Sequence, residues 1–106
     1  MALLGLGVAR RAYFWRWTSQ NYYHYVGSCQ TAEGAVEKYR AGRMTSLPYE
    51  KFDVNGIEFG YMDGGPPKCY HKTAATGGPI REGLRVRVSY AQLHFTPCIV
   101  KLEVAE

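Results

Sequence analysis

The sequence predicts an all-β protein with an N-terminal helix, built as a small five-stranded open barrel of the OB-like or SH3-like meander type. Its 106 residues suffice for one domain. Nine tyrosines and twelve glycines suit short strands that pack a thin aromatic core and turn sharply. Five segments alternate apolar and polar residues with period two, and no segment after the first 26 residues has a helical period. Together these observations favour an all-β meander.

The predicted strands begin after Gly27. Residues 31–39 form the first strand, in which Gly34 marks a bulge or a barrel bend. Residues 40–48 hold Gly and polar residues and are expected to form a loop.

A β-hairpin is the clearest local prediction. Residues 51–54 and 57–61 both alternate, and Asn55 and Gly56 lie between them. An Asn-Gly pair between alternating runs favours a type I′ turn, which needs positive φ at both central positions. The sequence therefore predicts two antiparallel strands here.

Two more strands follow a long connection. Residues 62–79 contain Gly-Gly-Pro at both ends and are expected to form a loop, either functional or mobile. Residues 84–90 and 99–104 alternate again, with a turn over residues 91–97. The expected core is Val36, Phe52, Val54, Ile57, Phe59, Tyr61, Val86, Val88, Tyr90, Val100, Leu102 and Val104.

The N-terminal region has a different composition. Residues 1–9 are apolar, too few to cross a bilayer, which needs about 20, and Arg10 and Arg11 follow them, whereas in a secretory signal the charges precede the apolar run. Both tryptophans lie in the next few residues. We expect an apolar, aromatic and basic arm at residues 1–26, helical over 9–25, followed by a barrel domain at 27–106.

The net positive charge of the chain arises from its first part. Through residue 45 there are six basic and two acidic residues, and afterwards seven of each. Trp and Arg mixed in this way are typical of a membrane interface, although an aromatic stripe packed on the barrel is the alternative. The residues expected to contact an anionic membrane surface or a protein partner are Arg10, Arg11, Trp15, Arg16 and Trp17.

Catalytic and metal-binding motifs are not evident. The favoured interpretation of Cys29, Cys69 and Cys98 is three small buried thiols in a reducing compartment, and one bridge plus one thiol is the alternative. We expect no metal and no cofactor, because the Cys and His residues lack paired short spacings. An enzyme that uses Cys69 and His71 of the 62–79 loop remains as a second alternative.

Nucleic-acid binding is the first alternative function. Small open barrels present basic and aromatic residues to single strands, and Arg85 and Arg87 lie on the outward face of one predicted strand. The barrel part is neutral, however, and its outward positions also carry acidic residues. Cross-strand charge pairs are therefore the favoured interpretation of these two arginines.

Spaced residues across residues 31–104 form one longer pattern. These residues are Glu33-Gly34-x-Val36-Glu37, Phe52-x-Val54-x-Gly56-x-x-Phe59-x-Tyr61-x-Asp63, Gly77-Gly78-Pro79-Ile80-x-x-Gly83-x-x-Val86-Arg87-Val88-x-Tyr90 and Ile99-Val100-x-Leu102-Glu103-Val104. The pattern resembles a family of small bacterial β-barrel proteins, uncharacterised in function, in which the barrel follows an N-terminal hydrophobic anchor. The resemblance implies this fold and an envelope association, and it carries no activity. The chain departs from the pattern after Tyr61 and lacks a complete spanning segment.

The sequence thus favours a non-enzymatic binding or scaffold module, held at a membrane surface or on a protein partner by its arm. The net positive charge of the first 45 residues and the presence of both tryptophans in the arm support this hypothesis. A cytoplasmic or inner-membrane location is favoured, and the small core makes oligomerisation a further expectation.

Overall fold

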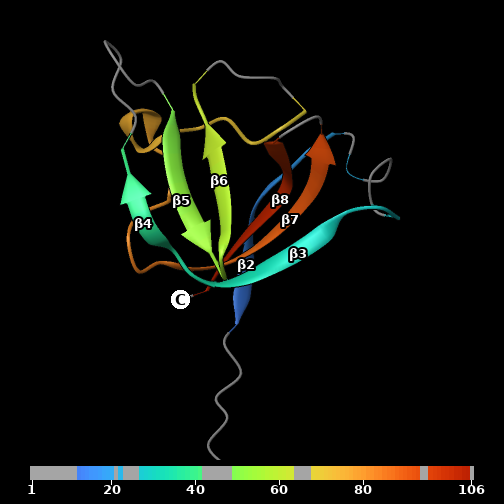
Figure 1. Cartoon of the computed structure of the whole chain (residues 1–106), viewed down its shortest axis with the longest axis horizontal. Helices are drawn as coiled ribbons and strands as arrows, with labels where there is room; N and C mark the ends of the chain where they lie inside the picture. Colours follow the sequence, from blue (N-terminus) through green and yellow to red (C-terminus); the bar gives the residue numbers. More distant parts are fainter. Residues whose placement is uncertain are drawn as a thin grey trace, which may run out of the picture.

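The computed structural model describes residues 12–20, 22, 27–41, 49–63, 68–93 and 96–105. These residues form two antiparallel sheets, which confirms the all-β class (Figure 1). One sheet has the order β2-β8-β7-β3 and the other β4-β5-β6. The strands are β2 (Tyr13–Thr18), β3 (Gln30–Ala35), β4 (Glu37–Arg40), β5 (Glu50–Val54), β6 (Ile57–Tyr61), β7 (Arg85–Leu93) and β8 (Thr96–Ala105), with a 3₁₀ turn η1 (Ala74–Thr76) before β7.

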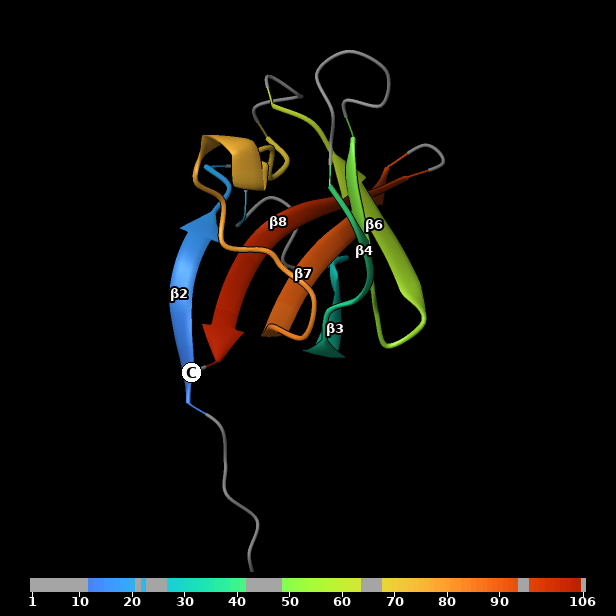
Figure 2. The same cartoon turned by 90° about the vertical axis from the view of Figure 1, so that its left-hand side faces the viewer.

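The predicted five-stranded open barrel is replaced by two sheets that face each other. Figure 2 shows β2, β8 and β7 on one side and β4 and β6 on the other. The strand expected over residues 31–39 is two strands, because the chain passes at Val36 from β3 in the first sheet to β4 in the second. This crossing gives each sheet its own edges, where a closed barrel would have none.

The helix predicted over residues 9–25 is wrong over residues 13–18. Tyr13–Thr18 forms strand β2, which pairs antiparallel with β8 from Tyr13 opposite Ala105 to Thr18 opposite Lys101. A bulge at Arg16 interrupts the register and hides the period-two pattern in the sequence. Pairing with a long neighbouring strand therefore decides the conformation of this aromatic segment.

The hairpin prediction is confirmed. β5 and β6 pair with Val54 opposite Ile57, and the turn residues Asn55 and Gly56 have φ of 50° and 81°. Both values are positive, as a type I′ turn requires. The predicted core is also confirmed: eleven of its twelve residues are buried, and Ile57 is half-buried and packs against the others.

Residues 68–84, here called the covering segment, close the side between β2 and β4. Tyr70, Ile80 and Leu84 of this segment are buried in the core. Its end pairs with the crossing residue, since Val36 N donates to Leu84 O and Gly83 N donates to Val36 O, at 2.8 and 2.9 Å. Within the predicted 62–79 loop, Tyr70 and Thr73 are buried, whereas Lys72 and residues 74–77 are exposed.

A disulfide joins the covering segment to β8. Cys69 and Cys98 are bonded, with their Cα atoms 5.1 Å apart. The prediction of three thiols is therefore wrong, and the alternative of one bridge plus Cys29 as a thiol is correct. Spacing alone gave no signal, because the two cysteines are 29 positions apart in the chain and meet only when the covering segment lies against β8.

Candidate functional site

The exposed aromatic residues of β2 are the most unusual surface feature of the described chain. The Phe14 side chain is 51% exposed and that of Trp15 is 65% exposed, and the two are adjacent on one strand. Apolar side chains of this size are normally buried. β2 is also an edge strand, whose only partner among the described residues is β8. Exposed aromatic residues on an unpaired sheet edge are typical of an interaction surface.

Tyr13 fixes the start of this edge. Its hydroxyl donates to Glu33 Oε2 on β3 at 2.8 Å, and its ring lies under the Arg87 guanidinium, whose carbon is 4.5 Å from the ring centroid. Arg87 in turn donates to both carboxylate oxygens of Glu103, each at 3.0 Å. Tyr13 therefore reaches across the outer face of the four-stranded sheet and holds β2 against it.

The register of β2 directs the next side chains apart. Phe14 is opposite Val104 and Trp17 is opposite Leu102, both inward residues of β8, whereas Trp15 is opposite the outward Glu103. Phe14 and Trp15 thus lie on opposite faces of the strand, and both are exposed.

The two tryptophans have different roles. The Trp15 indole donates to Thr18 Oγ1, which holds the ring along the strand while its face remains exposed. The Trp17 ring packs edge-on against Tyr70 of the covering segment, with centroids 5.5 Å apart. Trp15 is therefore available to a partner, and Trp17 is part of the packing that supports it.

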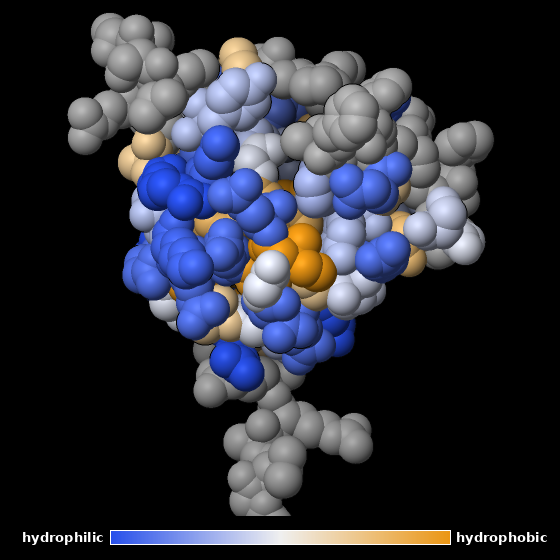
Figure 3. All heavy atoms as spheres, in the orientation of Figure 1, coloured by the Kyte–Doolittle hydropathy of each residue, from blue (hydrophilic) through white to orange (hydrophobic). Residues whose placement is uncertain are grey.

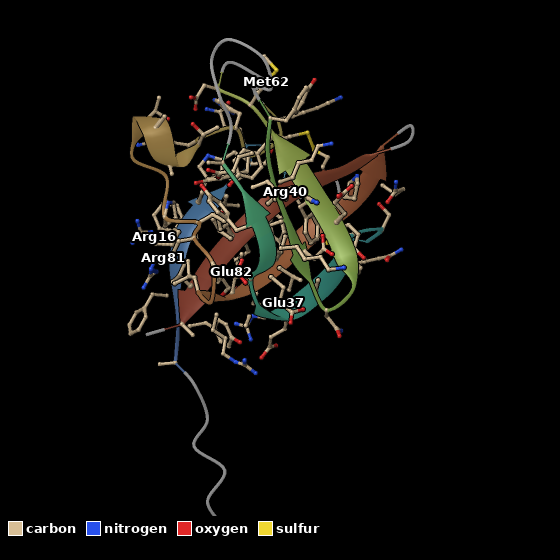
Figure 4. The ribbon with its side chains drawn as sticks, turned by 60° about the vertical axis from the view of Figure 1, so that its left-hand side comes forward. Arg16, Glu37, Arg40, Met62, Arg81 and Glu82 are labelled. Carbon is tan, nitrogen blue, oxygen red and sulfur yellow. A yellow bond between two sulfur atoms is a disulfide. The ribbon has the colours of Figure 1, made fainter. Side chains whose placement is uncertain are left out.

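Several cations lie on β2 or on the same side of the molecule. Arg16 is the bulged residue of β2, and Figure 4 shows Arg16 and Arg81 of the covering segment on the same side of the molecule. Arg85 lies close enough to Tyr13 to lower its pKa, although burial and Glu33 raise that pKa overall. Lys101, opposite Thr18, lies 5.5 Å from the Tyr22 ring centroid. None of these four cations forms an ion pair with a carboxylate of the described residues.

The other sheet presents a different outer face. Lys38 and Arg40 form ion pairs with Asp53, and Arg40 also pairs with Glu58 at 2.8 Å. Figure 3 shows hydrophilic side chains over most of this face. The charges of Lys38 and Arg40 are thus compensated, whereas Lys51 of β5 forms no ion pair with a carboxylate of the described residues.

The second feature is a buried carboxylate. Glu50 is fully buried at the start of β5 and accepts hydrogen bonds from three elements. The Tyr39 hydroxyl of β4 donates at 2.6 Å, the Ala74 amide of η1 donates at 2.9 Å, and the Tyr61 hydroxyl of β6 donates to the other oxygen. Burial and these bonds raise the pKa of Tyr39 to about 12 and the pKa of Tyr61 further still. Glu50 thus ties the covering segment to the three-stranded sheet.

A strained bulge aims Tyr39 at this carboxylate. The register between β4 and β5 shifts between Glu37 and Arg40, and Lys38 within the bulge has a φ of 53°. A non-glycine residue in the left-handed region is uncommon, and bulges redirect side chains.

Asp63 also holds η1, because it accepts from Thr73 N, Thr73 Oγ1 and Thr76 Oγ1 at 2.7–2.9 Å. Through Asp63 and Glu50, η1 is thus attached to β6 and β5 of the three-stranded sheet.

The residues considered for chemistry lie in structural roles. The Cys69 sulfur is bonded to Cys98, and His71 Nδ1 lies 2.9 Å from the Cys69 carbonyl oxygen. No group of three or more metal-ligating side chains occurs within the described ranges. Arg87 is engaged by Glu103 and Tyr13, as the cross-strand interpretation expects, while Arg85 has no such partner in the described chain.

The predicted docking residues are only partly described. Arg10 and Arg11 lie outside the described residues. Trp15 and Arg16 are exposed on β2, whereas Trp17 is half-buried against the core. Sequence reasoning did not single out Phe14, Tyr13 or Glu50. The signal for Phe14 was its position beside Trp15, but the bulge at Arg16 concealed that both side chains are exposed.

Comparison of the chain with protein-family models, with curated proteins and with solved structures gives no match. No helix within the described residues is long and apolar enough to cross a membrane.

Proposed function

We propose that this protein is a non-enzymatic binding module that docks on an anionic membrane surface through β2 and the arm that precedes it. The carrying observation is the pair Phe14 and Trp15, both more than half exposed on an edge strand. Aromatic rings of this kind concentrate at the level of lipid headgroups, where one side of the ring is apolar and the other is wet.

The charges beside the pair support an anionic partner. Arg16 of β2, Arg85 of β7 and Lys101 of β8 form no ion pair with a carboxylate of the described residues, and Arg10 and Arg11 precede β2 in the sequence. Each Lys or Arg near an anionic lipid surface contributes about 1 kcal/mol, and full burial of one large apolar side chain contributes about 1.5–3 kcal/mol. The combination of partial burial and charge attraction is what an interfacial site requires.

Two further observations favour this proposal over the alternatives. The apolar residues 1–9 precede β2 in the sequence, at the position of the N-terminal hydrophobic anchor in the bacterial family that the sequence resembles. Nucleic acid is less well supported, because Arg87 is held by Glu103 and the same outer face carries Glu33. The disulfide favours an oxidising compartment, in contrast to the reducing one predicted from the sequence.

Vesicle co-sedimentation of the full chain tests the proposal. The binding variant is Phe14→Ser with Trp15→Ser, and the matched control is Tyr49→Ser, since Tyr49 is the third exposed large apolar residue of the described chain at 50%. Wild type and Tyr49→Ser are expected to bind anionic vesicles and the double variant to bind at least about tenfold more weakly.

Salt and lipid charge sharpen the same assay. Binding is expected to weaken on neutral vesicles and at about 1 M salt, where the Debye length falls to about 3 Å. Equal binding of the double variant and wild type would refute the β2 site. If neither protein binds any vesicle, membrane docking is refuted, and a protein partner is left as the occupant of this edge.

A further inference from the structure

The disulfide lies next to the end of β2. β8 offers two consecutive carbonyl groups at this point: Val100 O accepts from Ser19 N, which follows β2, and Ile99 O accepts from Tyr70 N of the covering segment, at 2.8 and 2.9 Å. Cys98 immediately precedes Ile99, and its bonded partner Cys69 immediately precedes Tyr70. The disulfide thus holds the covering segment on β8 where β2 ends.

Tyr70 connects this junction to the exposed edge. Its side chain is 4% exposed and lies between Trp17 of β2 and Tyr61 of β6, with ring centroids 5.5 and 4.9 Å away. The Tyr70 hydroxyl has no hydrogen-bond partner within the described residues, so its placement depends on packing and on the backbone beside Cys69. Trp17 is two residues from Trp15 on a strand that pairs on one side only among the described residues. Any loosening of Tyr70 therefore acts on the strand that carries the exposed aromatic pair.

The two cysteines of the disulfide differ in burial. Cys69 is half-buried, whereas Cys98 is 4% exposed. In thiol–disulfide exchange a thiolate attacks one sulfur of the bond and the other sulfur leaves. The geometry directs attack to Cys69.

We propose that the Cys69–Cys98 disulfide is a redox latch that holds β2 in its docking conformation through the Tyr70–Trp17 contact. The reductant is a dithiol. One of its thiolates bonds to Cys69 Sγ while Cys98 leaves as a thiolate. Its second thiol then displaces Cys69, both cysteines take up protons, and the dithiol ends as a disulfide. Two electrons pass to the protein in this exchange.

Reduction removes one of several restraints on the covering segment. Asp63 still accepts from Thr73 and Thr76, and Glu50 still accepts from Ala74, so η1 stays attached. The part that loosens is the stretch around Tyr70, which the disulfide held on β8. Trp17 then loses its packing against Tyr70, and β2 is no longer held in its docking conformation. The affinity for anionic vesicles is expected to fall by about three- to tenfold, the factor that corresponds to one aromatic contact.

Two measurements on the full chain separate this inference, which rests on the proposed function, from that function itself. The first is amide hydrogen exchange at Ser19 and Tyr70 without vesicles, before and after reduction with a dithiol. Faster exchange at both amides, with Lys51 of β5 unchanged, is the expected result. Unchanged exchange at Ser19 and Tyr70 would overturn the latch, whatever the protein binds.

The second measurement compares vesicle affinity in the oxidised and reduced states. The Cys69→Ser, Cys98→Ser double variant serves as the redox-insensitive control, with affinity near that of the reduced wild type in both conditions. If oxidised and reduced wild type bind vesicles equally, the latch is wrong and membrane docking stands. If the oxidised protein does not bind vesicles at all, the proposed function fails, and the exchange experiment alone decides whether the disulfide restrains β2.

Discussion

The edges of β2 and β4 both border the covering segment, and the chain treats them in opposite ways. At β4 the Tyr39 amide donates to Glu82 Oε1 at 2.9 Å, a bulge distorts the strand, and charged side chains line it. At β2 no described strand pairs on the free side, and the exposed side chains include Phe14 and Trp15. Proteins protect edges by covering, bulging and charging them. β4 is covered as well as bulged and charged, whereas β2 has only the bulged, charged Arg16, and this difference supports the proposed binding surface at β2.

The largest expected effect lies on the protected side. Glu50→Ala removes the acceptor of Tyr39, Tyr61 and Ala74 and leaves buried donors unsatisfied. We expect the free energy of unfolding to fall by about 4 kcal/mol, measured by denaturant titration. Glu58→Ala, which removes an exposed ion pair on the same sheet, is the control and is expected to cost about 0.5 kcal/mol. Equal small losses for both variants would show that the Glu50 network does not hold the covered edge.

Loss of the disulfide has the second-largest expected effect on the free energy of unfolding. Replacing both Cys69 and Cys98 with serine opens a 29-residue link and is expected to lower the free energy of unfolding by about 3 kcal/mol. Thiol titration of the denatured, unreduced protein is expected to count one thiol, that of Cys29. A count of three thiols would contradict the bridge and remove the restraint that links β8 to the covering segment.

Mutation of the exposed edge is expected to change the free energy of unfolding only slightly. Phe14→Ser is expected to change the free energy of unfolding by less than about 0.5 kcal/mol, because the side chain is half exposed in the folded protein. Val54→Ser, on a fully buried side chain, is expected to cost more than about 2 kcal/mol. A large loss for Phe14→Ser would mean that the ring supports the fold, and the contrast between the edges would weaken.

The smallest effect is a pH dependence of the Tyr13–Arg87–Glu103 clamp. Hydrogen bonds from Arg87 lower the pKa of Glu103 in the folded state. A lowered folded-state pKa stabilises the protein above the unfolded-state pKa, about 4, and this stability is lost as the pH falls through the folded-state value. Glu103→Gln is therefore expected to reduce the acid sensitivity between about pH 4 and pH 2 by less than about 1 kcal/mol. Acid unfolding curves of the two proteins that differ by a constant at every pH would contradict this assignment.

Tyr39 contributes at the opposite end of the pH range. Burial and its bond to Glu50 raise its pKa to about 12, so its contribution is complete below about pH 10 and is lost as the pH rises to about 12. Tyr39→Phe is expected to be less stable than wild type at pH 8 and to lose less stability between pH 10 and pH 12. An identical alkaline decline in the two proteins would exclude Tyr39 as its source.

Local patterns in the sequence were sufficient for the hairpin and most of the core. Asn55 and Gly56 specify their turn by backbone conformation alone, and Val86 and Val88 follow the alternation of a single strand. Sequence patterns did not predict the structure where it depends on a partner that is distant in the sequence. β2 is a strand because β8 is beside it, and Cys69 meets Cys98 because the covering segment folds back. Glu50 appears as an ordinary charged residue in the sequence, since its three donors come from separate elements.

The emission of Trp15 on vesicles tests the central claim most directly. In the full chain carrying Trp17→Phe, Trp15 is the only tryptophan, and phenylalanine keeps an aromatic ring against Tyr70. Titration with anionic vesicles that contain brominated lipid is expected to shift the Trp15 emission to the blue and to quench it, because the ring enters the headgroup region. Emission that stays unshifted and unquenched at lipid concentrations that sediment the protein would show that β2 does not meet the membrane.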